Sequence, residues 1–253
     1  MKKVIIVLFF IFISKIVQAS IIEELDLPPE GAHGGQMLLG FVFTIGYPLG
    51  DAIDAENSFV ENSTYTFSDS GTTKKFYIDH IGISFGLMFE YMVIDYVGIY
   101  SRFRRNMIIQ RTSFGSDYEN TSEELFSDYS IMVGPSFHLT TRKWWDVSIT
   151  PIIGYSFGSF TATPVATTLL SGYTGGETMT ANGLIIALEL RFTAYFSGGF
   201  FLSAGFEWAM NMATLDGSYT LTNPQTGAAY GLSSSFSLHT TGFIMAAGYA
   251  FSN

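Results

Sequence analysis

The stretch IGISFGLMFEY, residues 81–91, decides the fold that we predict for this chain. Large apolar or aromatic side chains occupy every second position from Ile81 to Tyr91, and glycine or serine fills three of the five positions between them. Successive side chains of a β-strand point to opposite faces, so alternation over this length predicts a strand with one apolar face.

Seven further segments alternate in the same way, namely 37–45, 97–103, 129–139, 147–157, 184–192, 202–212 and 243–251. The connections between the segments alternate in length. Short turns are expected near 93–95, 140–144 and 197–199, and long polar connections near 49–73, 112–128, 161–180 and 214–233. This rhythm is typical of a transmembrane barrel with tight periplasmic turns and long outer loops. We therefore predict an all-β fold, an eight-stranded antiparallel up-and-down transmembrane β-barrel over residues 36–253.

A soluble eight-stranded barrel has the same period and is the main structural alternative. Its large residues would point inward, yet the interior of eight strands is only just wide enough for side chains to fill. The opposite set of residues, mostly glycine, serine, threonine and alanine, suits a narrow lumen better. Charged residues are only 13% of the chain and aromatic residues 16%, which also favours a surface that faces lipid.

The first 35 residues precede the predicted barrel. Residues 1–19 have the charged start, apolar core and small-residue cleavage site of a secretory signal peptide. A transmembrane anchor is the weaker interpretation, because the apolar run is well short of the ~20 residues that a helical span needs. Residues 20–35 then form an acidic periplasmic segment. We expect the mature protein in the outer membrane of a diderm bacterium.

Charge and cysteine content exclude several classes of partner and cofactor. Removal of the signal takes three lysines with it and moves the formal charge from −10 to −13, so nucleic acid is not an expected partner. The chain has no cysteine, which excludes disulfides and thiolate metal sites. No histidine spacing indicates a metal site, and we expect no cofactor.

Aromatic residues gather beside the predicted short turns, where amphipathic rings form the periplasmic girdle of a membrane barrel. The candidates are Tyr91, Tyr96, Trp144 and Trp145, with Tyr195, Phe196 and Phe200 beside the last turn. The chain ends in GFIMAAGYAFSN, residues 242–253, in which Phe243, Tyr249 and Phe251 resemble the C-terminal strand signal for insertion of outer-membrane barrels. The last aromatic residue is followed by Ser252 and Asn253, whereas it is usually the terminal residue in such barrels.

As a whole, residues 36–251 resemble the OmpA/OmpX-type small outer-membrane barrels, including the opacity-protein group. The resemblance implies an eight-stranded meander, contact with outer-membrane lipids and insertion by the barrel assembly machinery. Function varies among such barrels, and some of them are lipid-modifying enzymes.

The stretch YVGIYSRFRRN, residues 96–106, places arginines within a predicted strand. Arg102 and Arg104 have the parity of the lumen, because a charge facing lipid near the midplane would cost roughly 2–4 kcal/mol. Arg105 has the outward parity, and its long aliphatic side chain allows the guanidinium to reach the outer interface. A turn centred near Ile94 would pair Arg102 with Gly86 and Arg104 with Ser84.

Other ionisable residues share the lumen parity. A turn symmetrical about Gly198 makes Glu189 and Glu207 direct neighbours across two strands, where their charges repel unless cations lie between them. We therefore predict an ionic network in the lumen, with Glu90 peripheral to it near the periplasmic end. Its members are Arg102, Arg104, Glu189, Arg191 and Glu207. A core network that only fills the barrel and a switchable gate over a narrow conduit are both compatible with this set.

Catalytic groups are sparse. Ser237 and His239 share the outward parity of the last strand and are the only candidate nucleophile and base, but no acid that would orient the imidazole is identifiable. Acidic residues in the predicted outer loops indicate a solvated surface; they are Asp51, Asp54, Glu56, Glu61, Asp69, Asp117, Glu119, Glu123, Glu124 and Asp128.

We expect a non-enzymatic barrel with an envelope-structural or adhesion-like surface role through its outer loops, where an extracellular protein or surface ligand would bind. A narrow conduit for small or hydrophobic solutes is the alternative, and a lipid-modifying enzyme is third.

Overall fold

The computed structural model describes residues 34–51, 53–54, 64–66, 73–114, 121–141, 144–161, 178–217, 219–222, 229–232 and 235–251. The predicted signal peptide and most of the acidic segment after it lie outside the described residues. Within the described ranges, no helix is long and apolar enough to cross a membrane.

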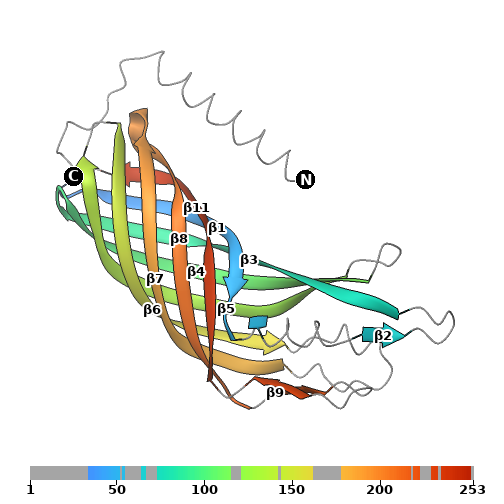
Figure 1. Ribbon diagram of the computed structural model, residues 1–253. Coiled ribbons are helices and arrows are strands. Elements are labelled where there is room, and N and C mark those ends of the chain that lie inside the picture. The colour runs from blue at the N-terminus through green and yellow to red at the C-terminus, as the bar shows by residue number, and fades with distance from the viewer. Residues whose placement is uncertain are drawn as a thin grey trace.

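Eight long strands form one closed antiparallel sheet (Figure 1). The strands are β1 (Met37–Leu49), β3 (Thr73–Ile94), β4 (Val97–Phe114), β5 (Thr121–Thr141), β6 (Trp145–Thr161), β7 (Thr178–Tyr195), β8 (Phe200–Leu215) and β11 (Ser235–Phe251). Neighbours in sequence are neighbours in the sheet, and β1 pairs with both β3 and β11. This closure removes the sheet edges, so the predicted eight-stranded up-and-down barrel is confirmed.

The exterior of the barrel carries the large apolar residues at alternate positions. In β3, Phe85, Leu87 and Phe89 are 46%, 45% and 41% exposed, whereas the residues between them face inward. The same alternation runs along the other barrel strands, which confirms the predicted parity. A continuous apolar exterior on a closed sheet is the surface that a bilayer covers, because the ladders pair the backbone groups of each strand with both neighbours along most of the wall.

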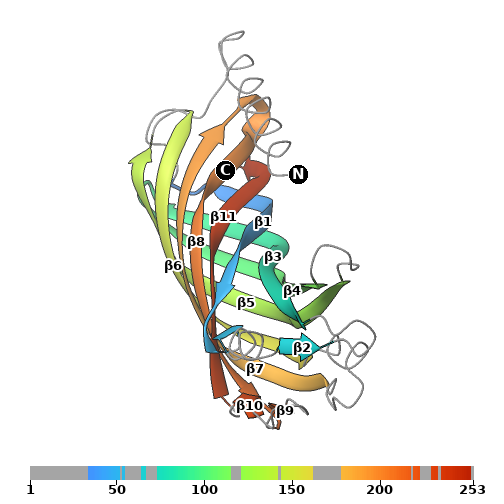
Figure 2. The ribbon, with the colours of Figure 1, turned by 45° about the vertical axis from the view of Figure 1, so that its right-hand side comes forward.

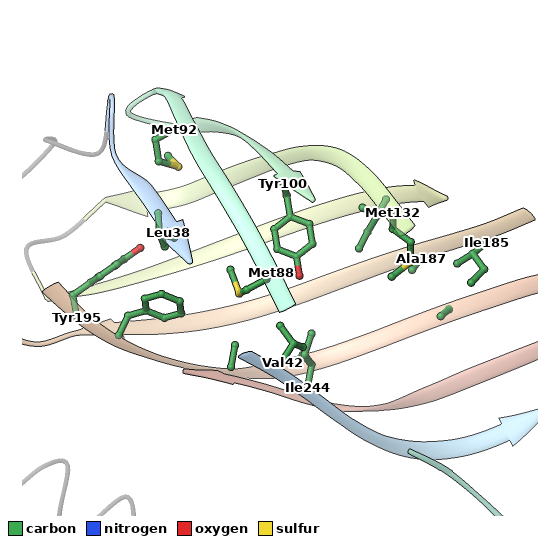
Figure 3. Close-up of a cluster of buried hydrophobic side chains, with 14 residues drawn as sticks. Leu38, Val42, Met88, Met92, Tyr100, Met132, Ile185, Ala187, Tyr195 and Ile244 are labelled. Atoms are coloured by element: carbon green, nitrogen blue, oxygen red, sulfur yellow. The ribbon is translucent and has the colours of Figure 1, made fainter. Parts of the chain in front are cut away.

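The lumen differs from the prediction in one respect. Its residues are not mostly small, because a cluster of buried apolar side chains fills one part of the interior and points inward from several strands (Figure 3). Its largest fully buried members are Met88, Met92, Tyr100, Met132, Ile185 and Phe201. The interior of an eight-stranded barrel is closed by its own side chains, so some of the inward residues must be large.

The short turns lie at one end of the barrel. Asp95 and Tyr96 join β3 to β4, residues 142–144 join β5 to β6, and a 3₁₀ turn η1 (Ser197–Gly199) precedes β8. Gly198 and Gly199 have φ values of 74° and 84°, a left-handed conformation that glycine adopts without steric cost. By the rule for transmembrane barrels, this end faces the periplasm.

The opposite end differs from the prediction in the second long connection. Residues 112–114 and 121–128 are strand rather than loop, because β4 continues to Phe114 and β5 begins at Thr121, with Thr112 paired to Thr121. Beyond the bilayer a strand needs no apolar face, so a polar composition does not mark its end. Three short strands also lie at the outer end: β2 (Thr64–Thr66) pairs with β3, and β9 (Tyr219–Thr222) forms a hairpin with β10 (Ala229–Leu232).

Candidate functional site

The structure brings the five residues of the predicted lumen network together inside the barrel. Arg102 and Arg104 come from β4, Glu189 and Arg191 from β7, and Glu207 from β8. Each of the five is at most 2% exposed. Strands on opposite sides of the barrel therefore meet through charged groups that are shielded from water.

Arg102 lies at the centre of the network. Its Nη1 donates to Glu189 Oε1 at 2.7 Å and also donates to Glu207 Oε2. Its Nη2 donates to the hydroxyls of Thr44 at 3.0 Å and Ser84 at 3.2 Å. The predicted pairing of Glu189 with Glu207 is observed in the sheet register, and the Arg102 guanidinium is the cation between the two carboxylates.

Arg104 adds a second cation to Glu207. Its Nη1 donates to Glu207 Oε1 at 2.6 Å, and its Nε donates to the Ser130 hydroxyl at 3.3 Å. The predicted strand partners of the two arginines are wrong, since Arg102 pairs with Met88 and Arg104 with Gly86. The turn lies at Asp95 and Tyr96, one residue later than assumed, and the shift by two positions keeps the inward parity.

Arg191 extends the network toward the periplasmic end. Its Nε and Glu189 Oε2 lie 3.3 Å apart as an ion pair without hydrogen-bond alignment, and its Nη2 donates to Glu90 Oε2 at 3.3 Å. The Arg191 guanidinium lies 4.6 Å from the centroid of the Tyr100 ring, whose hydroxyl donates to Glu189 Oε1 at 3.4 Å. A stacked ring and several acceptors hold this cation in one orientation.

The prediction that Glu90 is peripheral to the network is wrong, because Glu90 links Arg191 to a histidine and an aspartate. His138 Nε2 lies 2.9 Å from Glu90 Oε1, and His138 Nδ1 contacts Asp146 Oδ2. Both ring nitrogens thus face carboxylates, and only a protonated imidazole can donate to both. Sequence reasoning missed His138 and Asp146, although both have the inward parity of their strands.

The contacts form one chain of alternating charge through the lumen. In order, the chain runs Asp146, His138, Glu90, Arg191, Glu189, Arg102, Glu207 and Arg104. Four carboxylates meet three guanidiniums, and a protonated His138 balances the fourth. The chain members are at most 5% exposed, whereas side chains that line a water-filled pore would be wet. We call these eight residues the ionic chain.

A separate polar group lies farther toward the outer end. Asp128, predicted in a loop, is a fully buried residue of β5. Asn211 Nδ2 donates to Asp128 Oδ2 at 3.3 Å and to the Ser156 hydroxyl at 2.9 Å. Among the described residues, no group of histidine and acidic side chains is arranged to hold a metal ion.

The predicted girdle residues lie beside the short turns. Tyr91, Tyr96 and Trp144 are exposed on the exterior, and the half-buried Trp145 stacks on Phe192 with ring centroids 5.8 Å apart. Tyr195 does not belong to this set, because it points inward and packs in the apolar lumen cluster. It is the last residue of β7 and keeps the inward parity of Arg191 and Thr193.

The chain is an outer-membrane β-barrel. Its closed wall, its apolar exterior and the aromatic residues beside its short turns support this assignment together. The residues of the predicted insertion signal, Phe243, Tyr249 and Phe251, also lie exposed on the exterior. Arg105 takes the outward parity as predicted, and its guanidinium lies 5.7 Å from the centroid of the Tyr129 ring.

Ser237 and His239 do not form a catalytic pair. The Ser237 hydroxyl donates to Asp51 Oδ2 at 3.0 Å, and the Ser237 backbone N–H donates to the same oxygen at 2.9 Å. The His239 ring lies against Trp208, with ring centroids 6.1 Å apart. The predicted pair requires His239 to accept the Ser237 hydroxyl proton, and that hydroxyl donates to Asp51 instead, which links the residue just after β1 to β11.

Known proteins are similar to this chain only at low sequence identity. No protein-family model matches the chain, and no curated protein is significantly similar to it in sequence. The structure of OprG from Pseudomonas aeruginosa is 14% identical, with a TM-score of 0.43 over 88% of this chain and 99% of that chain. Ail of Yersinia pestis, in complex with the heparin analogue sucrose octasulfate, is 14% identical, with a TM-score of 0.43 over 86% and 99%. Neisserial surface protein A is 10% identical, with a TM-score of 0.41 over 84% and 96%. The likenesses concern the fold alone, and the assignment above rests on the geometry of the barrel itself.

Proposed function

We propose that this protein is a non-enzymatic surface protein whose barrel is an anchor closed along its axis and whose outer end makes the functional contacts. The outer loops would bind an extracellular protein or another surface ligand, and the barrel would hold them at a fixed height above the membrane.

The observation that carries this proposal is the length of the strands. A transmembrane β-strand needs about 9–11 residues to cross the bilayer. In contrast, β3 has 22 residues and β5 has 21. The outer parts of β3, β4 and β5 run well past the end of β1 (Figures 1 and 2). The surplus sheet stands outside the membrane and would present the loops that it joins.

Two further observations support an anchor rather than a channel or an enzyme. The side chains of the ionic chain and of the apolar cluster are buried and lie across the lumen. The Ser237 hydroxyl donates to Asp51 rather than to His239, so the serine–histidine pair that the sequence suggested is not formed.

The expected partners follow from this role. Outer-membrane lipids cover the apolar exterior. The barrel assembly machinery would recognise the last strand through Phe243, Tyr249 and Phe251, whose side chains all lie on the lipid face. The exposed position of these residues is compatible with recognition before the barrel closes.

The proposal is tested by trimming the outer end. In separate variants, residues 53–66 or the β9–β10 hairpin are replaced by a short Gly-Ser turn, and cells that produce each variant are compared with parent and gene-deletion cells. Cell-to-cell aggregation and attachment to immobilised laminin report the surface role, while sensitivity to detergent reports envelope integrity. We expect at least one trimmed barrel to fold normally and to lose a surface phenotype without a change in detergent sensitivity. If parent cells aggregate and attach no better than deletion cells, the surface role is wrong.

A further inference from the structure

Pro135 on β5 and Pro151 on β6 lie directly opposite each other in the barrel wall. The pairs on either side, Val133 with Ile153 and Phe137 with Ile149, fix this register, but residues 134–136 of β5 have no ladder partner on β6. Both prolines face outward. In contrast, β6 keeps an unbroken ladder with β7, in which Pro151 pairs with Leu188. The interruption therefore belongs to the β5–β6 contact alone.

The facing prolines remove two hydrogen bonds from the wall. In an antiparallel ladder, alternate opposite pairs exchange two N–H···O bonds. The gap spans one position on each side of the proline pair, which is the pattern expected when that pair should exchange bonds and cannot. Proline has no N–H, so both bonds are missing and neither carbonyl finds its donor on the opposite strand.

The gap lies deep in the membrane. Pro151 is six residues from Trp145 at the periplasmic end. With about 3.3 Å per residue and a strand tilt of roughly 40°, this corresponds to about 15 Å, half the thickness of a hydrocarbon core. At this depth no water replaces the missing donors, so the wall is weakest where it faces acyl chains.

A pair of hydroxyls closes the gap from inside. Ser136, which follows Pro135, and Thr150, which precedes Pro151, are the next facing pair in the same register, and their hydroxyl oxygens lie 3.1 Å apart. Each hydroxyl also contacts the ionic chain, since Ser136 Oγ lies 3.3 Å from His138 Nε2 and Arg191 Nη2 donates to Thr150 Oγ1 at 3.5 Å. The side-chain contact is thus held by the same charges that close the lumen.

The interior on the outer side of the gap is apolar. In the same register, Gly134, which has no side chain, faces Ile152, and Ile152 pairs with Ala187 on β7. Met132, Ile152 and Ala187 belong to the apolar lumen cluster, and Figure 3 shows Met132 and Ala187 within it. A group that passed between the strands here would meet hydrocarbon rather than charge.

We propose that the β5–β6 seam at Pro135 and Pro151 is a lateral entry through which a hydrocarbon chain inserts from the bilayer against Met132 and Ile152. The ligand class is a linear acyl chain, because such chains form the medium outside the seam. The backbones of β5 and β6 are in close contact at Gly134 and Pro151, so the chain enters only when the two strands separate. The Ser136–Thr150 hydroxyl pair is the latch. This inference goes beyond the proposed surface role and does not depend on it.

A photoreactive phospholipid with a diazirine in its acyl chain tests the proposal. The folded protein is placed in vesicles that contain this lipid, irradiated and mapped by mass spectrometry. We expect labels on the outward residues and also on the inward Met132 and Ile152, with much less on the inward Val42 of β1. A parallel sample receives a photoreactive free fatty acid instead. Labelling of Ile152 by the phospholipid, by the free fatty acid or by both shows which of them can supply the acyl chain. Each of these results supports lateral entry through the seam.

Two variants separate the seam from other routes into the lumen. Because the chain has no cysteine, Ser136→Cys with Thr150→Cys can be joined specifically, and the oxidised form should lose the Ile152 label that the reduced form retains. Pro135→Val with Pro151→Val restores both N–H donors and should lower the label by about tenfold. Heat-dependent gel migration checks that each variant is folded. The proposal is overturned if the parent carries no inner label, or if the oxidised pair is labelled like the parent.

Discussion

Glu189 and Glu207 lie directly opposite each other on β7 and β8 inside the barrel, and the Arg102 guanidinium on β4 donates to both carboxylates. Two like charges at such a position destabilise a sheet on their own. Through these two contacts, which we call the clamp, the arginine joins β4 to β7 and β8 across the lumen, although β4 is not their neighbour in the wall. The barrel is therefore held by its interior as well as by its ladders.

Removing both carboxylates should weaken the barrel. In Glu189→Gln with Glu207→Gln, Arg102 keeps Thr44 and Ser84 but loses its anionic partners. Loss of one side of a buried ion pair typically costs about 3–5 kcal/mol, less where water enters. We expect a lower free energy of unfolding in urea, measured by tryptophan fluorescence in detergent micelles.

Charge reversal is the matched control for this clamp. A variant with Glu at positions 102 and 104 and Arg at 189 and 207 restores opposite charges with the sides exchanged, and it should recover part of the lost stability. An unfolding curve of the Gln variant that overlays the parent curve would mean that the arginines are compensated by water or by other groups.

His138 is predicted to be structural as well. In His138→Ala, Glu90 and Asp146 lose the group that lies between them, and the free energy of unfolding should fall on the order of 3 kcal/mol. His239→Ala is the control, because this ring only packs on Trp208 at the outer rim and should cost about 1 kcal/mol or less. If the two variants lost the same free energy of unfolding, the ion pairs of His138 would contribute no extra stability to the barrel.

The outer rim should show no lipid chemistry. Incubation of the purified protein with envelope lipids, followed by mass spectrometry, should show neither hydrolysis nor acyl transfer, and Ser237→Ala should not change the lipid profile. The same variant should make the outer end of β11 more accessible to protease, since it removes one of the two contacts with Asp51. A lipid product that disappears in both Ser237→Ala and His239→Ala would establish an enzyme.

The girdle tryptophans should report the depth of the barrel in the bilayer. With Trp208→Phe, fluorescence comes from Trp144 and Trp145 alone, and lipids brominated near the head group should quench it more than lipids brominated near the chain end. As a control, Leu188→Trp is placed in a background where Trp144, Trp145 and Trp208 are all Phe. Leu188 is exposed opposite Pro151, so this tryptophan should show the reverse order. The same order in both proteins would contradict the membrane placement.

The sequence allowed the wall to be predicted better than the interior. Alternation fixed which residues of 81–91 face lipid, and the symmetrical turn at Gly198 fixed the pairing of Glu189 with Glu207. Contacts between strands that are not neighbours depend on the tilt and shear of the barrel, which a linear pattern does not encode. For this reason Glu90 was thought peripheral, although its side chain meets Arg191 and His138.

One other feature of the interior was within reach of sequence reasoning. His138 and Asp146 have the inward parity of their own strands, so both could have been included in the lumen set. The facing of Pro135 and Pro151 could not be predicted from the short turn between them, because the irregularity between His138 and Thr140 shifts the register by one residue. Asp128 was harder to place, because the polar composition of 112–128 is that of a loop.

The conductance of the purified, folded barrel in a planar lipid bilayer tests the central claim most directly, that the ionic chain and the apolar cluster close the lumen along its axis. The account predicts no sustained current steps. A barrel with an open pore, measured at the same lipid-to-protein ratio, should conduct. Steady stepwise currents through the parent protein would show that the lumen is an open pore, and the account would be wrong.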